Sequence, residues 1–146
     1  MVAQIQNPIH EYASLFARLT PDNLTELSGM VADNIVFSDP FNLTYGRDKF
    51  IYIFEHMFKV MDSPKFEILD TSISDRAGYI KWRLTGKVKK WHKISIDIIG
   101  MSEIINDETG VITAHYDHWD SASQLISLIP VFGLPTRWVL NLFKLK

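Results

Sequence analysis

The chain of 146 residues contains no cysteine. This absence excludes disulfide frameworks, cysteine-ligated zinc sites, iron–sulfur clusters and thiol catalysis. A long hydrophobic run is also lacking, because the stretch from Leu125 to Leu134 is interrupted by Ser127, Pro130 and Gly133 and is too short to span a bilayer. The first seven residues lack the basic and apolar regions of a signal peptide. We therefore expect a soluble, cytoplasmic protein.

An excess of charge of one sign is lacking as well. Fifteen Lys and Arg residues against 17 Asp and Glu residues give a net charge of −2, which offers no overall attraction to nucleic acid or anionic membranes. Residues 76–93 do hold seven basic residues and no acid. Strand alternation, however, places Trp82 on the opposite face from Lys81 and Arg83, and only Trp91 and His92 fall on the basic side. The basic segment predicts a solvated sheet surface and no nucleic-acid partner.

The chain has enough apolar residues to form one hydrophobic core. Hydrophobic residues make up 47% of the sequence, with nine Phe, five Tyr and four Trp. A domain of this size buries roughly 68–70% of its unfolded surface without needing disulfides. No repeat and no linker rich in Pro, Gly or Ser divides the chain, so we expect a single domain over residues 1–146.

The hydrophobic pattern changes from helical to strand periodicity along the chain. Apolar residues spaced three and four apart predict helices over 8–20, 24–30 and 48–61. Alternation predicts strands over 35–37, 66–74, 79–88, 93–105 and 111–120, with a hairpin turn at 106–110. Two short apolar helices, 121–130 and 135–145, close the chain. This order predicts the α+β class, with helices on one face of a curved antiparallel sheet.

Two stretches resemble a known superfamily. In the first, Asp39-Pro40-Phe41 follows a short strand and Gly46 then opens a helix. The second runs from Ile104 through an acidic turn to a last strand that ends in His-x-Asp-x-x-Asp. Both are similar to the nuclear transport factor 2-like superfamily, in its SnoaL-like and ketosteroid isomerase-like branch. The resemblance implies a cone-shaped sheet with the N-terminal helices packed on its concave face and a C-terminal helical tail.

The resemblance also implies candidate site residues. Asp39 matches the general base of the isomerase, which works with a Tyr and a protonated Asp as hydrogen-bond donors. Here Gly100 or a neighbour stands in place of the carboxylic acid, and the expected Tyr falls at Leu15 or Phe16, with Tyr12 one turn earlier. Each lost oxyanion donor costs a few kcal/mol of transition-state stabilisation. Steroid isomerisation by that mechanism is therefore not expected, and Asp39 can equally be a structural turn residue.

The last strand is the richest segment in functional groups. Residues two apart share a face of a strand, so His115, Asp117 and Trp119 lie on one side and Tyr116 and His118 on the other. A His and a carboxylate about 7 Å apart on one face can perform acid–base chemistry. In SnoaL-like cyclases an acidic residue on this strand has that role, and Asp117 fits it best. The alternative is a buried polar pair with a structural role.

The predicted site is a small-molecule cavity. Its expected ligand-binding residues are Tyr12, Phe54, Trp82, Ile98 and Trp119. No metal site is expected, because the odd separation turns His115 and His118 to opposite faces of the strand. No cofactor motif is present either.

Two functions stay open. The first is acid–base catalysis of the isomerase, cyclase or hydratase type on an apolar, carbonyl-containing or polycyclic molecule, by Asp117 or Asp39 with assistance from His115. The second is a non-catalytic ligand-binding or dimeric interaction domain. The resemblance further implies a homodimer formed through the outer face of the sheet.

The apolar tail from Ile126 to Leu145 is the least expected feature of the sequence. Trp138, Val139, Leu142 and Phe143 recur at helical spacing. The tail can be a lid over the cavity, a strap across a dimer, or a membrane-surface anchor, and the small number of cations disfavours the anchor. We expect the tail to pack onto protein, at the cavity mouth or across the dimer, and a membrane to be an improbable partner.

Overall fold

The structure is a computed structural model that describes residues 7–90 and 94–145. The predicted start of a strand at Lys93, the hairpin residues Trp91 and His92, and the first six residues lie outside this part of the chain. None of the described helices is long and apolar enough to cross a membrane.

Three helices come from the first half of the chain: α1 (Pro8–Ala17), α2 (Leu24–Met30) and α3 (Arg47–Val60), with a 3-10 turn at Pro21–Asn23. The Asn7 side chain caps α1 by accepting a hydrogen bond from the Ile9 amide, and Pro8 occupies the first turn, where its missing N–H costs nothing. Gly46 precedes α3 with φ = 101°, a conformation that favours glycine. The helices predicted at 8–20, 24–30 and 48–61 are therefore present.

Six strands form one sheet in the order β2-β1-β6-β5-β4-β3. They are β1 (Val31–Ser38), β2 (Leu43–Tyr45), β3 (Met61–Ile73), β4 (Gly78–Val88), β5 (Ser95–Asn106) and β6 (Ile112–Trp119). β3 to β6 pair antiparallel as a meander, whereas β1 pairs parallel with β6. The α+β class is confirmed, with two differences: the sheet is mixed at one seam, and β2, only three residues long, gives too short a pattern to be predicted.

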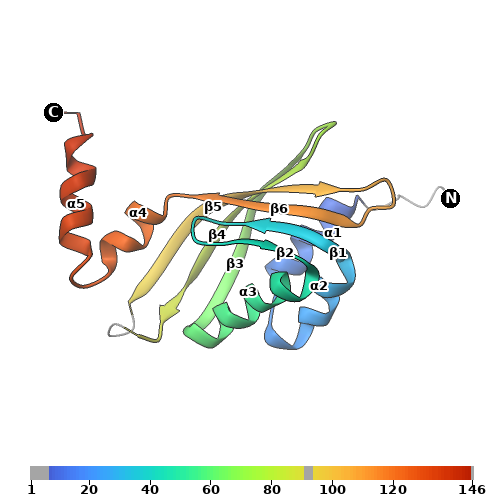
Figure 1. Ribbon diagram of the computed structural model, residues 1–146, viewed down its shortest axis with the longest axis horizontal. Helices are drawn as coiled ribbons and strands as arrows, with labels where there is room; N and C mark the ends of the chain where they lie inside the picture. The colour runs from blue at the N-terminus through green and yellow to red at the C-terminus, as the bar shows by residue number, and fades with distance from the viewer. Residues whose placement is uncertain (1–6, 91–93, 146) are drawn as a thin grey trace.

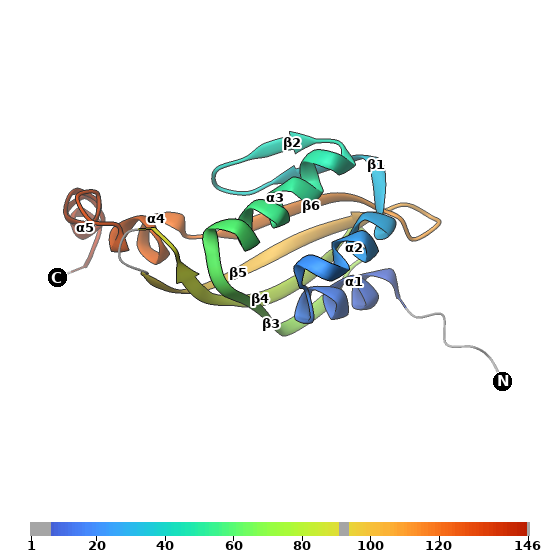
Figure 2. The ribbon, with the colours of Figure 1, turned by 90° about the horizontal axis from the view of Figure 1, so that it is seen from below.

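The sheet curves around the helices (Figure 2). α3 contacts both β1 and β3, which are distant in the strand order, so the sheet must bend to bring them together. α1 packs against β3 on the same concave face. The inward residues of β4 and β5 alternate as predicted, and Ile80, Trp82, Ile96 and Ile98 are at most 5% exposed.

The C-terminal tail departs from its prediction. It consists of α4 (Ser121–Gln124), a 3-10 turn (Ile126–Leu128) and α5 (Gly133–Leu142). α5 packs against this turn and α4 and extends away from the sheet (Figures 1 and 2). Trp138 is 65% exposed and Phe143 83%, and no residue of α5 lines the cavity described below. Within one chain, the tail is therefore not a lid.

Candidate functional site

Two adjoining hollows lie between the helices and the concave face of the sheet. The larger has a volume of about 670 Å³ and is walled mainly by apolar side chains from β1, α3, β4 and β5. The smaller, of about 20 Å³, lies deeper. Phe54, Phe66, Trp82 and Asp117 line both hollows, so these four residues form the boundary between them.

The structure brings all of the predicted site residues to these hollows. The larger one is lined by six of them: Asp39, Phe54, Trp82, Ile98, Asp117 and Trp119. Tyr12 and His115 line the smaller one. The rings of Phe41 and Trp119 meet edge to face, with their centroids 5.6 Å apart, on the wall of the larger cavity.

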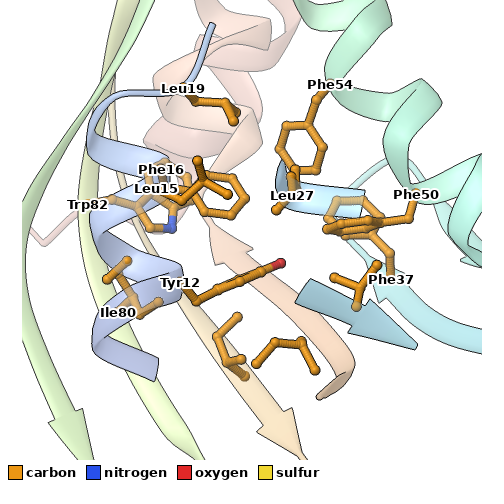
Figure 3. Packing of buried hydrophobic residues seen from close by; sticks show 14 of the residues in the cluster. Tyr12, Leu15, Phe16, Leu19, Leu27, Phe37, Phe50, Phe54, Ile80 and Trp82 are labelled. Atoms are coloured by element: carbon orange, nitrogen blue, oxygen red, sulfur yellow. The ribbon is translucent and has the colours of Figure 1, made fainter. Parts of the chain in front are cut away.

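Tyr12, His115 and Asp117 form a buried chain of hydrogen bonds. The Tyr12 hydroxyl lies 2.8 Å from His115 Nδ1, and His115 Nε2 lies 2.8 Å from Asp117 Oδ1. Figure 3 shows the Tyr12 ring projecting from α1 toward the Phe37 and Phe50 side of the core. The His115 side chain is only 4% exposed and five aromatic rings surround it, the nearest being Phe37 with a centroid distance of 5.3 Å. This packing fixes the imidazole in one orientation.

A second branch reaches the same carboxylate oxygen. The buried Trp82 Nε1 donates to Ser102 Oγ at 2.8 Å, and Ser102 Oγ donates to Asp117 Oδ1 at 2.5 Å. β4, β5 and β6 are consecutive in the sheet, and the register pairs Trp82 with Gly100 and Ser102 with Asp117. The branch therefore runs across three strands on their inner face.

The donors in both branches point toward Asp117. An ionised carboxylate can only accept hydrogen bonds, so His115 Nε2 donates to it and His115 Nδ1 accepts from Tyr12. Burial, together with the nearby Asp117 charge, raises the pKa of Tyr12 well above its usual value of 10.0. Tyr12 therefore stays protonated at neutral pH and can donate, which is consistent with this assignment.

Asp117 keeps one oxygen available. Oδ1 accepts from Ser102 and His115, whereas no group in the described part of the chain bonds Oδ2. The Asp117 side chain is 16% exposed and lines the larger cavity. The carboxylate is therefore held through one oxygen, and its second oxygen is left without a bond in the described part of the chain at the boundary between the two hollows.

Asp39 lies at the cavity wall but is occupied by its own loop. Its Oδ1 accepts from the backbone amides of Phe41 and Asn42 at 2.8 and 2.6 Å, and both oxygens lie 3.1 Å from Asn42 Nδ2. The geometry is that of an Asx turn between β1 and β2. Both Asp39 oxygens are therefore engaged, unlike Asp117 Oδ2.

Ser102 is the site residue that the sequence analysis missed. It is 3% exposed and shares the inner face of β5 with Ile96, Ile98 and Ile104. A single hydroxyl in an otherwise apolar inward row was the available signal, because a buried hydroxyl needs a partner. Its partners come from β4 and β6, which a one-strand pattern cannot show.

The two histidines of the last strand separate as their spacing predicts. His115 is buried, whereas His118 is exposed on the outer face and lies 3.9 Å from Glu103. Among residues 7–90 and 94–145, no three His, Asp or Glu side chains group closely enough to hold a metal ion.

Known structures with the same fold support this description of the chain. A candidate SnoaL-like polyketide cyclase from Jannaschia sp. CCS1 superposes with a TM-score of 0.75 at 10% identity, covering 86% of this chain and 92% of that one. A hypothetical protein from Catenulispora acidiphila with a ketosteroid isomerase-like fold, in complex with trimethylamine, gives 0.69 at 15% identity over 91% and 97%. A computationally designed binder of 17-OHP gives 0.65 at 13% identity over 79% and 95%. At these identities the likeness shows the fold alone.

Sequence comparison identifies the family. No curated protein sequence matches the chain significantly. The profile of the SnoaL-like domain, however, matches residues 12–120, which run from the tyrosine of the hydrogen-bond chain to the cap of α4. The chain therefore belongs to the SnoaL-like family, within the nuclear transport factor 2-like fold.

Proposed function

We propose that this protein binds a small apolar molecule with a carbonyl group in the larger cavity and that Asp117 acts on it as a general base. The observation that carries the proposal is the carboxylate of Asp117, which is bonded through Oδ1 from two sides, has no bond to Oδ2 in the described part of the chain, and lines a largely apolar cavity. A carboxylate moves a proton efficiently only when it is within hydrogen-bond reach and fixed in orientation. Ser102 and His115 provide the fixing.

The proposed step is a proton transfer. Asp117 Oδ2 takes a proton from the carbon next to the carbonyl, the electron pair moves onto the carbonyl oxygen, and the same carboxyl returns the proton to another atom of the ligand. Isomerisation and aldol-type cyclisation can both begin in this way. In a hydration the same carboxylate would instead take a proton from a water molecule as its oxygen adds to the ligand, and the carboxyl would return that proton to the neighbouring carbon. An apolar ligand that fills the cavity would displace water from the carboxylate, which strengthens the electrostatic interactions inside the cavity.

The other predicted residues have supporting roles in this proposal. Phe54, Trp82, Ile98 and Trp119 form the apolar surface that the ligand contacts. Tyr12 and His115 position Asp117 through the buried chain. Asp39 holds the loop at the cavity wall rather than acting as the base, because its oxygens are already bonded.

The related structures agree with a small-molecule ligand. Their names include a candidate polyketide cyclase and a designed binder of 17-OHP, so proteins of this fold are named for small-molecule ligands or substrates elsewhere. We carry over only this class of ligand. A homodimer and a cytoplasmic location also stay predictions of the sequence.

The base can be tested without knowing the natural substrate. 5-Nitrobenzisoxazole loses its C3 proton to a carboxylate base, and its N–O bond then breaks to give a coloured cyanophenolate. We expect the full chain to catalyse this elimination and Asp117→Asn to lower the rate at least 100-fold, the scale expected of a general base. Asp39→Asn is the matched comparison, because it removes a second carboxylate from the same cavity wall while keeping an acceptor oxygen for the loop. Loss of activity in Asp39→Asn but not in Asp117→Asn would contradict the proposal.

A second candidate is a carrier that binds the same ligand without converting it. The observation that favours it is that, by the resemblance, Gly100 or a neighbour stands where the isomerases have a hydrogen-bond donor for the developing oxyanion. Binding of the fluorescent apolar probe ANS separates the two functions. If the full chain binds ANS, with Asp117→Asn unchanged, but shows no elimination activity, the carrier is correct.

A further inference from the structure

The C-terminal helix α5 carries its apolar side chains outward, the reverse of an ordinary surface helix. Seven large apolar side chains of the tail are more than 60% exposed: Val131, Phe132, Leu134, Trp138, Leu142, Phe143 and Leu145. A helix of a globular protein normally turns such a stripe toward the core. This exposed face of residues 131–145, which we name the tail face, is thus available for a contact outside its own chain.

Specific contacts fix the direction of the tail face. The Arg137 guanidinium donates to the Ser127 carbonyl, which ties α5 to the preceding 3-10 turn while Arg137 stays exposed. Gly133 allows the close approach, since a Cβ there would lie 2.5 Å from the Ser127 oxygen. The Gln124 amide fastens the base of the tail to the sheet by accepting from the Ile99 amide and donating to the Ile99 carbonyl. The tail is therefore fixed in position with its apolar side facing the solvent.

Charge separates the tail from the rest of the chain. All 17 acidic residues precede residue 121, whereas three of the 15 basic residues follow it, namely Arg137, Lys144 and Lys146. The tail therefore carries +3 and the remainder −5. The whole-chain charge of −2 conceals this asymmetry.

A second tail is a poor partner for this face. Pairing two tails would bring Arg137 and Lys144 of both copies close together without an acid in either tail, and like charges in contact repel. One side of a ten-residue helix is about 15 Å long, so it offers much less than the roughly 800 Å² per partner that stable interfaces bury. The positive charge of the tail and the small area of one helix side favour a partner that is apolar, anionic and extended.

We propose that the tail face is an interfacial anchor for an anionic phospholipid surface. Trp and Phe side chains enter the boundary between headgroups and acyl chains, and nearby Lys and Arg are attracted to anionic lipids. Lys144 follows α5 directly, and Trp138 lies at the centre of the exposed stripe. At ten residues α5 is too short to span, so it lies in the interface. This inference revises the expectation that a membrane is an improbable partner, because the structure leaves the stripe uncovered.

The test is sedimentation of the full chain with vesicles of phosphatidylcholine alone and with vesicles containing 30% phosphatidylglycerol. We expect binding to the anionic vesicles that weakens with salt. The double variant Trp138→Ser with Leu142→Ser should weaken it at least tenfold. The control is Leu43→Ser with Tyr45→Ser, which removes two apolar side chains of similar exposure, 60% and 62%, from the edge strand β2. The control should bind like the unchanged chain.

A second readout locates the contact. Brominated acyl chains should quench part of the tryptophan fluorescence, and Trp138→Phe should remove that quenching. The anchor is overturned if the full chain binds neither vesicle. It is also overturned if the tail variant leaves vesicle binding unchanged, or if that variant instead converts a dimer into a monomer, which would make a second copy the partner.

Discussion

Gly100 shows how one residue decides the composition of the cavity wall. A Cβ at this position would lie 2.5 Å from two ring carbons of Trp82 and 3.0 Å from Trp119 Cβ. The Trp82 indole therefore fills the space into which a side chain would point. The carboxylic acid of the isomerases cannot be accommodated at Gly100 beside this indole. The same indole donates through its nitrogen to Ser102, so the absence of a side chain at Gly100 leaves room for the ring that reaches the Asp117 network.

Deprotonation of Tyr12 should change the free energy of unfolding. Its buried hydroxyl is hydrogen-bonded to His115 Nδ1. Replacing Tyr12 with Phe would leave this nitrogen without its donor and lower the free energy of unfolding by about 1–3 kcal/mol near neutral pH. The pKa of Tyr12 is raised in the folded state by burial and by Asp117. Its contribution is thus complete below the unfolded value of 10.0 and is lost as the pH rises above it.

We therefore expect the difference in unfolding free energy between the unchanged chain and Tyr12→Phe to narrow above pH 10. Urea unfolding at pH 7, 9 and 11 measures it. Tyr45→Phe, at a position 62% exposed, is the control, and its effect should be small at every pH. A Tyr12→Phe difference that grows with pH would contradict the assignment of Tyr12 as a protonated donor.

At the scale of elements, periodicity predicts most of the structure because each helix and strand buries one face. The strand over 79–88 was recognised because Ile80 and Trp82 alternate with Lys81 and Arg83, and that alternation is a local property. The parallel seam between β1 and β6 could not be predicted, since it joins Val36 to Ala114 across the whole chain. Ser102 was missed for the same reason, because its partners lie on two other strands. The direction of the tail could not be predicted either, because helical spacing of apolar residues does not determine whether the apolar side faces the protein or the solvent.

We expect Gln124 to hold the tail in place without contributing to the packing of the core. The β5–β6 pairing ends at Gly100, so no β6 residue bonds the backbone of Ile99. The Gln124 side-chain amide bonds it instead, accepting from the Ile99 amide at 2.7 Å and donating to the Ile99 carbonyl at 3.0 Å. Gln124→Ala removes both bonds and should increase hydrogen exchange at the Ile99 amide and proteolysis within residues 125–145. The melting temperature should change by only a few degrees, because this exposed pair contributes about 1 kcal/mol. Gln124→Glu keeps an acceptor for the Ile99 amide and should show a smaller effect. Equal protection in all three chains would mean that the tail is held by other contacts.

At the scale of the whole molecule, the outer face of the sheet has the properties of an interface. Leu69 on β3 and Ile99 and Met101 on β5 are 42–47% exposed there. The basic residues of β4, which would repel across a two-fold axis, have acidic neighbours. Arg83 bonds Asp97 at 2.5 Å, and this bond lowers the pKa of Asp97. Pairing of this kind reduces the repulsion that the run of basic residues suggests.

We therefore expect a homodimer with a two-fold axis through the outer sheet face, seen by light scattering at micromolar concentration as a species of twice 16.9 kDa. Met101→Asp should dissociate it, because two-fold symmetry places both copies of the new charge in one apolar contact. Leu43→Asp, on the edge strand β2, should leave it intact. The serine variants at Trp138 and Leu142 should also leave the mass unchanged, since the tail face belongs to a different contact. A single species of 16.9 kDa in the unchanged chain would refute the dimer, and loss of the dimer only in the tail variants would move the interface from the sheet to α5.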